Sequence, residues 1–247
     1  MSLFIMSPCY CPDATPADGL MATARRVGLE PHLYGVGKQI ATNCSNAQGT
    51  DMLALMEQRA EKYIMCVDSM DVAFLAGEQE IMEKFLAFDS GLVVSAEKEG
   101  ICGVRKTKQR LHEMCLEAGG YHPHLNMGGW IGEREYALHV FKEAERLYQP
   151  IPEDSYNYDV LPQWLMQMKA RMGVGGEPGP RGPAFELDWH AVLFQSMNQT
   201  ADELTWDASA KRMYNEVTGT MPVLLHYNGD KTYGAYHKMV RRILEGE

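Results

Sequence analysis

The chain has 247 residues, of which 45% are hydrophobic, so it is long enough for one large domain with a sizeable buried core. Its 33 acidic residues outnumber its 23 basic residues and give a formal net charge of -10. An acidic surface disfavours broad nonspecific binding to nucleic acid, although it leaves room for a local basic groove.

The six cysteines are scattered along the chain, and Cys9 and Cys11 form the only close pair, without a second pair to complete a zinc site. We therefore expect free thiols in a reducing compartment. No basic residue precedes the short apolar run in 1–7, and no stretch is apolar over the length that a bilayer requires. These features lead us to expect a soluble, cytoplasmic protein.

Strands and helices alternate in the first hundred residues. The patterns predict a strand at 3–6, a helix at 16–27, a strand at 32–36, a helix at 47–62, a strand at 63–67, a helix at 78–88 and a strand at 92–96. The last two strands are continuously apolar, which is typical of parallel sheets buried on both faces. This alternation predicts a doubly wound α/β layer.

The second half is less regular. Its patterns predict helices at 107–118, 133–147 and 156–172, a strand that contains Asp188, and a late strand at 222–226. The segment 173–183 is rich in glycine and proline, so we expect a mobile loop there.

Two acidic residues, Asp68 and Asp71, follow the apolar strand at 63–67. In an open α/β sheet the carboxyl ends of the strands border the ligand crevice. Carboxylates at this place suit Mg²⁺ or Mn²⁺ bridging a diphosphate. The alternative is a solvated turn or a helix cap, and for this spacing taken alone that alternative is the stronger one.

The segment 124–132 contains Asn126, Gly128 and Gly129. Paired glycines let a backbone approach a ligand closely, and an asparagine can hydrogen-bond sugar hydroxyls. An ordinary glycine-rich turn before the helix at 133–147 explains the same residues equally well.

His226 ends the late strand, and Lys231 follows it by five residues. Imidazole is a good ligand for Mn²⁺, and a lysine ammonium is a compact counter-charge for phosphate. Alternatively, a single histidine on an apolar segment is a hydrogen-bonded core residue.

Together and in this order, the motifs resemble those of GT-A glycosyltransferases, and more closely those of the glycosyltransferase domain of the lysyl hydroxylase (procollagen galactosyl/glucosyltransferase) family. The similarity is carried by VDSMDV at 67–72, VSAE at 94–97, LNMGGWIG at 125–132, LDWHAVLFQ at 187–195 and MPVLLHYNG at 221–229. It implies a single α/β GT-A domain over 1–247, with a Rossmann-like, mostly parallel sheet flanked by helices. Residues 1–100 would form the nucleotide-binding half and 101–247 the acceptor-side half.

The resemblance also implies a metal-dependent transfer of sugar from a nucleotide sugar, a UDP-sugar, with Mn²⁺ or Mg²⁺ held by Asp68, Asp71 and His226. The residues expected beside the donor are Ser7, Pro8, Asp68, Ser69, Asn126, Gly128, Gly129, Gly229 and Lys231. Asp154, in an acidic cluster at 152–155, is the first candidate for a catalytic carboxylate, and Asp188 is the second.

Two acceptors remain open: a hydroxylated protein residue, or a hydroxymethylated DNA base as in viruses that glycosylate their genomes. Basic residues that could border a phosphate-bearing acceptor are Arg105, Lys106, Lys108, Arg110, Lys169, Arg171 and Arg181. We prefer the alternative that 105–110 is a solvated helix start. The rival functions are a non-catalytic nucleotide-sugar-binding module and a nucleotide-sugar hydrolase.

Overall fold

The computed structural model describes residues 2–38, 45–100, 105–148, 165–166, 168–170, 185–228 and 233–246. In chain order its elements are β1 Leu3–Pro8, η1 Thr15–Ala17, α1 Asp18–Arg26, β2 His32–Tyr34, α2 Ser45–Glu57, β3 Tyr63–Val67, β4 Val72–Phe74, α3 Glu78–Leu86, β5 Leu92–Glu97, α4 Arg105–Glu117, β6 His124–Glu133, α5 Arg134–Tyr148, β7 Glu186–Asp188, β8 Phe194–Ser196, η2 Ala201–Glu203, β9 Leu204–Asp207, β10 Arg212–Asn215, β11 Leu224–His226 and α7 Tyr233–Glu245. All seven elements predicted in the first hundred residues are present.

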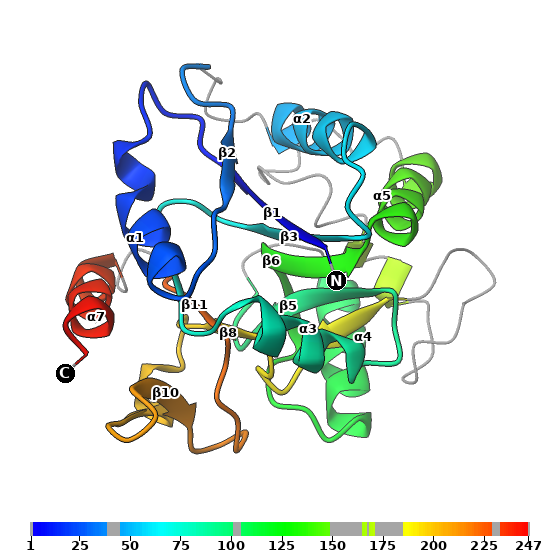
Figure 1. The fold of residues 1–247 in the computed structure, drawn as a ribbon. Coiled ribbons are helices and arrows are strands. Elements are labelled where there is room, and N and C mark those ends of the chain that lie inside the picture. Colours follow the sequence, from blue (N-terminus) through cyan, green and yellow to red (C-terminus); the bar gives the residue numbers. More distant parts are fainter. Residues whose placement is uncertain are drawn as a thin grey trace.

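Six strands form the central sheet in the order β2-β1-β3-β6-β5-β7 (Figure 1). β6 runs antiparallel to β3 and β5, whereas the other neighbouring pairs are parallel. The mostly parallel α/β sheet predicted from the sequence is therefore confirmed. Because β6 runs in the opposite direction, it begins at the edge where its neighbours end. The glycine-rich segment 124–132 lies within this strand, so its interpretation as a turn is wrong.

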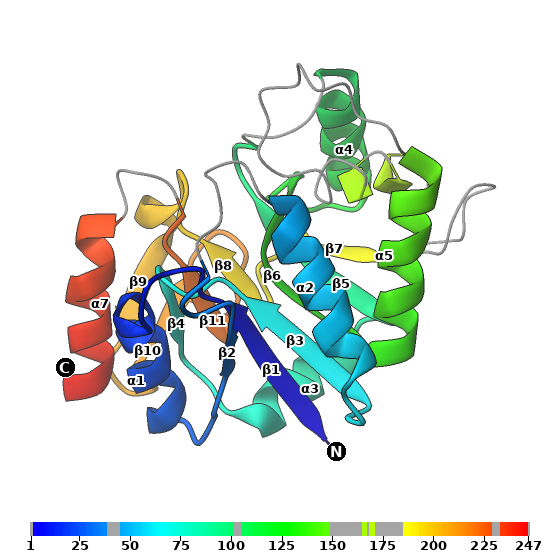
Figure 2. The same ribbon diagram turned by 90° about the horizontal axis from the view of Figure 1, so that it is seen from above.

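Helices cover both faces of this sheet (Figure 2). On one face, α2, α4 and α5 pack their apolar side chains against Trp130 and the strands around it. On the other face, α1 and α3 pack against side chains such as Val67 and Ile131. Burying apolar surface on both sides explains the continuous apolar runs of β3 and β5.

A smaller sheet has the order β4-β11-β8, with β11 antiparallel to β4 and parallel to β8. Helices α1 and α7 lie side by side next to it (Figures 1 and 2). Their side chains satisfy backbone groups of β4, because the amide of Phe74 donates to Thr23 Oγ1 and the Tyr236 hydroxyl donates to the carbonyl of Val72. The end of β11 is thereby held next to the end of β3.

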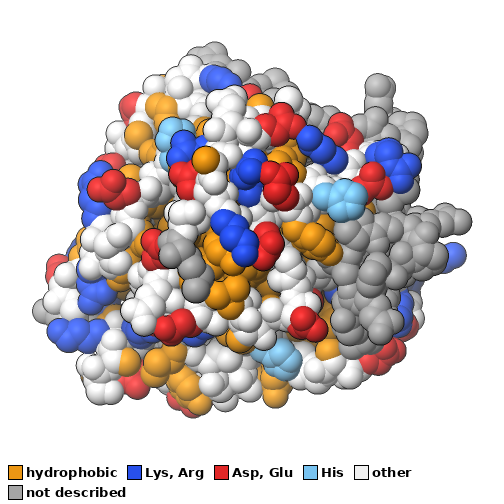
Figure 3. Space-filling model, turned by 45° about the vertical axis from the view of Figure 1, so that its right-hand side comes forward, with side chains coloured by type: hydrophobic (Ala, Val, Ile, Leu, Met, Phe, Trp, Pro, Cys, Tyr) orange, Lys and Arg blue, Asp and Glu red, His pale blue; other side chains and the backbone are white. Residues whose placement is uncertain are grey.

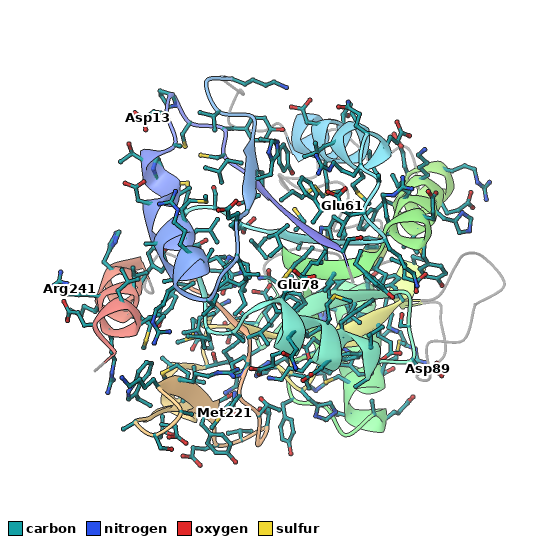
Figure 4. The ribbon with its side chains drawn as sticks, viewed as in Figure 1. Asp13, Glu61, Glu78, Asp89, Met221 and Arg241 are labelled. Atoms are coloured by element: carbon teal, nitrogen blue, oxygen red, sulfur yellow. The ribbon has the colours of Figure 1, made fainter. Side chains whose placement is uncertain are left out.

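The hairpin β9–β10 is fastened to this sheet by Arg212. Its guanidinium pairs with Glu80 at 2.5 Å and donates to the carbonyls of Met221, which Figure 4 labels, and Pro222 at 3.1 and 2.9 Å. These contacts connect the hairpin to α3 and to the segment that enters β11.

The structure describes four of the six cysteines, and Cys44 and Cys102 lie outside the described residues. Cys9, Cys11, Cys66 and Cys115 are free thiols. Among the helices that the structure describes, none combines the length and the apolar character that a membrane span needs. Most of the helix predicted at 156–172 and the whole loop at 173–183 lie outside the described residues.

Candidate metal and donor site

Asp68, Asp71 and His226 come together at the edge where β3 and β11 end. The register of β4 and β11 pairs Val72 with His226, and the amide of Tyr227 donates to the carbonyl of Asp71 at 2.8 Å. The imidazole is therefore fixed beside a carboxylate that lies far away in sequence. One potential ligand atom from each residue lies within 4.8 Å of the other two, as a metal site requires.

The imidazole lies beneath the two carboxylates. His226 Nε2 is 3.2 Å from Asp68 Oδ2 and 3.5 Å from Asp71 Oδ1, and the histidine is buried while both aspartates reach solvent. Burial alone would lower the pKa of His226, but its hydrogen bonds to the two carboxylates raise the pKa to about 10. The carboxylates thus favour a positive charge at this place. A divalent cation would supply that charge, with His226 as a neutral nitrogen ligand.

Gly128 leaves the space that the imidazole occupies. A Cβ at this position would lie 2.0 Å from His226 Cε1, 2.4 Å from its Nδ1 and 2.8 Å from Asp68 Oδ2. His226 Nδ1 is also buried without a hydrogen-bond partner among the described residues. The hard carboxylate oxygens and the imidazole form a donor set that fits Mn²⁺ or Mg²⁺, and Gly128 leaves room for it.

Gly129 faces away from this cluster. A Cβ on Gly129 would lie 2.7 Å from Cδ1 of Phe194, a core side chain on the opposite face of the sheet. Successive residues of a strand point to opposite faces, so only the α-carbon of Gly128, of this pair, is turned toward the candidate metal ligands. The close packing of Phe194 against this position explains why residue 129 is a glycine.

Ser7 and Pro8, which were predicted to lie beside the nucleotide of the donor, end β1. Ser7 is fully buried, and its hydroxyl has no partner among the described residues. Burial and the neighbouring Cys11 raise the pKa of the Cys9 thiol, and the hydroxyl of Ser69 opposes this shift. Ser69 therefore lies beside the end of β1. In the sheet, β2 lies on one side of β1 and β3 on the other, so the order of the strands changes direction here. Open α/β sheets bind nucleotides at such a point.

A polar cluster that the sequence did not indicate lies next to this edge. The Tyr10 hydroxyl and the Lys38 ammonium both donate to Asp51 Oδ2, at 2.9 and 2.6 Å. The Tyr10 ring meets Tyr34 edge to face, and it packs so closely over Gly35 that a Cβ there would lie 2.7 Å from it. These contacts fix the backbone that follows β2.

Glu97 was also missed as a site residue. It ends β5 and is 5% exposed. Its Oε2 accepts hydrogen bonds from the side-chain amides of Asn126 and Asn228, at 3.0 and 2.7 Å, and the Asn126 carbonyl oxygen accepts from the amide of Gly128 at 2.8 Å. The signal was available, because Glu97 is an acidic residue at the end of an apolar strand, much as Asp68 directly follows one.

Of the two predicted catalytic carboxylates, the structure describes Asp188 but not Asp154. Asp154 lies outside the described residues, as do Gly229 and Lys231. Asp188 is fully buried, and its carboxylate accepts hydrogen bonds from the amides of 192–194, each at 2.8 Å. Burial raises its pKa, while these backbone hydrogen bonds act in the opposite direction. The Asp188 carboxylate therefore stabilises the turn before β8.

Among the basic residues proposed to border an acceptor, the structure describes Arg105, Lys106, Lys108, Arg110 and Lys169. The Lys108 ammonium donates to the carbonyl of Gly100 at 2.6 Å, and Arg110 pairs with acidic residues of its own helix. Lys169 is 1% exposed and donates to the carbonyl of Phe185 at 2.6 Å, so its placement on a basic surface is wrong. Arg171 and Arg181 lie outside the described residues. On the face in Figure 3, the described basic side chains lie among acidic ones.

Comparisons with known proteins place these features in a family. A family model described as the PLOD GT domain matches residues 18–150, more than half of the chain. Multifunctional procollagen lysine hydroxylase and glycosyltransferase LH3 of Homo sapiens is 30% identical over 174 residues, which are 69% of this chain and 21% of that protein. Procollagen-lysine,2-oxoglutarate 5-dioxygenase 1 of Homo sapiens is 27% identical over 195 residues, with 75% and 24% covered. The chain thus spans about a fifth to a quarter of the length of these relatives.

A solved structure supports the fold. The crystal structure of a glycosyltransferase involved in the glycosylation of the major capsid of PBCV-1 superposes with a TM-score of 0.52 at 11% identity, covering 98% of this chain and 99% of that one. At this identity the likeness concerns the fold alone. Together with the family model, it leads to one conclusion: the chain belongs to the PLOD GT domain family and is a glycosyltransferase with the GT-A fold.

Proposed function

We propose that the protein is a metal-dependent glycosyltransferase that moves a sugar from a UDP-sugar to a hydroxyl acceptor. The observation that carries this proposal is the cluster of Asp68, Asp71 and His226 at the carboxyl edge of the sheet. These residues would hold Mn²⁺ or Mg²⁺. When bound, the cation would act as a Lewis acid on the diphosphate leaving group.

The protein's own residues position the donor around this cluster. Ser7, Pro8 and Ser69 border the nucleotide, since they lie where the chain order of the sheet reverses. Glu97 and Asn126 face the donor sugar from the other side of Asp68, because Asn126 is hydrogen-bonded both to Glu97 and to Gly128. A carboxylate and an amide match hydroxyl groups, which both donate and accept.

The roles of Asp154, Gly229 and Lys231 remain proposals from the family resemblance. Asp154 would accept the proton of the acceptor hydroxyl or orient that hydroxyl, and Gly229 and Lys231 would contact the diphosphate. A lysine there would stabilise negative charge as it develops on the leaving group.

A hydroxylated protein residue is the acceptor that the observations favour. Lys108 and Arg110 are occupied by contacts within the chain, and Lys169 is buried. The chain as a whole is acidic, with a formal charge of -10, which also disfavours a DNA acceptor.

Binding and transfer assays test the proposal. Calorimetric titration of UDP, UDP-glucose and UDP-galactose, with Mn²⁺ and with EDTA, should give binding that requires the cation. Transfer is then assayed to a peptide that contains hydroxylysine and to single-stranded DNA that contains a hydroxymethylated base. Equal donor affinity with Mn²⁺ and with EDTA would rule out the metal site. Transfer to the DNA but not to the peptide would reverse the choice of acceptor.

A further inference from the structure

A closed circuit of polar side chains links the ends of β5, β11 and β8. It begins at Glu97, whose carboxylate accepts from Asn228 Nδ2 at 2.7 Å. The Asn228 carbonyl oxygen in turn accepts from the hydroxyl of Ser196 at 2.7 Å. Since Asn228 lies two residues after His226, these bonds connect the metal ligand to Glu97.

The circuit continues through the core beneath β8. The backbone carbonyl of Ser196 accepts from Gln195 Nε2 at 2.8 Å and from the hydroxyl of Thr200 at 2.5 Å. Asn215 then donates from Nδ2 to Gln195 Oε1 at 2.8 Å and lies 3.3 Å from Glu203 Oε2. Gln195, Thr200 and Asn215 are completely buried, so their mutual hydrogen bonds are needed to offset desolvation.

Glu203 closes the circuit. Its carboxylate is 7% exposed, and it lies 2.6 Å from the ammonium of Lys98 through Oε1 and 3.4 Å from His122 Nε2 through Oε2. Lys98 is the residue directly after Glu97. The ion pair therefore fixes the backbone that carries the Glu97 carboxylate, from a side that does not contact the metal ligands.

The β9–β10 hairpin has further attachments besides this ion pair. Arg212 already fastens the hairpin through Glu80 and through the carbonyls of Met221 and Pro222. A buried carboxylate is expensive unless it is paired, and the contact of Glu203 with the Lys98 ammonium is shorter than its contacts with His122 and Asn215. The charged pair has a specific consequence, which is the placement of the chain after β5.

We propose that Lys98 and Glu203 are positioning residues for the donor sugar. They hold Glu97 against Asn126 and Asn228. In this position the Glu97 carboxylate contacts the sugar hydroxyl groups of a bound UDP-sugar, and it does not contact the nucleotide. This inference rests on the proposed function, because it takes Glu97 to border the donor sugar.

The test compares the affinity for UDP with the affinity for a UDP-sugar, both measured by calorimetry in Mn²⁺. UDP-glucose and UDP-galactose are both titrated, and the one that wild-type protein binds more tightly is used. Lys98→Met should weaken binding of that UDP-sugar by about fivefold to tenfold, the equivalent of one lost hydrogen bond, and should leave UDP affinity unchanged. Lys98→Arg keeps the ion pair and should restore the wild-type ratio.

Two further variants complete the design. Lys98→Met leaves a charged Glu203 carboxylate with the longer contacts to His122 and Asn215. The double variant Lys98→Met/Glu203→Gln removes both charges and should give the same selective loss if the single variant does not fold. Glu216→Gln is the control, since Glu216 is exposed directly after β10 and its carboxylate accepts a hydrogen bond from the Thr205 hydroxyl.

The outcomes separate the two proposals. A wild-type ratio of UDP-sugar to UDP affinity in Lys98→Met or in the double variant overturns the positioning role and leaves the proposed function intact. An equal loss for UDP and for the UDP-sugar also overturns it, because a general disturbance of the site would do the same. Wild-type protein that binds no UDP in Mn²⁺ overturns both.

Discussion

Substituting Gly128 by alanine tests whether the cluster of Asp68 and His226 binds a cation. The added methyl carbon would lie 2.0 Å from His226 Cε1 and 2.8 Å from Asp68 Oδ2, so the imidazole must move by more than 1 Å to reach an ordinary contact distance of roughly 3.5 Å. We expect this to weaken Mn²⁺ binding by about 10- to 100-fold, the usual consequence of disturbing the orientation of a metal ligand.

The matched control is Gly129→Ala, one residue away. Its methyl carbon would lie 2.7 Å from Phe194, so it overpacks the core on the other face of β6. Both variants should lose about 1–3 kcal/mol of unfolding free energy, but only Gly128→Ala should lose cation affinity.

Titration with Mn²⁺ in the presence of UDP, and urea unfolding of the same samples, measure the two effects. Wild-type Mn²⁺ affinity in Gly128→Ala would refute the site. So would an equal loss of affinity in both glycine variants, because cation binding would then report only the integrity of the sheet.

The central part of the fold was predictable because its signals are local. Apolar runs at 63–67 and 92–96 and the helix start at Thr15 need no knowledge of partners. β6 was not predictable in this way, since Gly128 and Gly129 weaken the strand signal. Their presence is explained by His226 and Phe194, which come from distant parts of the chain.

The candidate site residues also differ in whether their signal is local or depends on distant parts of the chain. Asp68 and His226 could be proposed as site residues because Asp68 follows an apolar strand and His226 ends one, and Glu97 could have been proposed by the same rule. The pairing of Lys98 with Glu203 could not, because the two residues are 105 positions apart and meet only through the fold. Lys169 was named among basic residues that could border an acceptor, whereas its ammonium lies 5.6 and 5.5 Å from the ring centroids of Phe185 and Trp189 in the core.

Three further substitutions test individual residues. Asp71→Ala should abolish cation-dependent UDP binding and turnover without a change in the far-UV circular dichroism spectrum, since the backbone carbonyl that Tyr227 uses is retained; full activity would contradict the metal mechanism. Asp188→Asn should cost about 2–3 kcal/mol in urea unfolding, because an amide cannot accept all three backbone hydrogen bonds; unchanged stability with a large loss of turnover would instead support a catalytic role. Burial lowers the pKa of Lys169 from 10.5 to about 8. The unfolded chain keeps this proton to a higher pH than the folded protein does, so deprotonation favours the folded state. The unfolding free energy of the wild type, relative to that of Lys169→Met, should therefore rise between about pH 8 and 10.5, by up to about 3 kcal/mol. Urea unfolding of both proteins at about pH 7 and pH 10 measures this difference, and a difference that stays constant with pH would show that Lys169 is solvated.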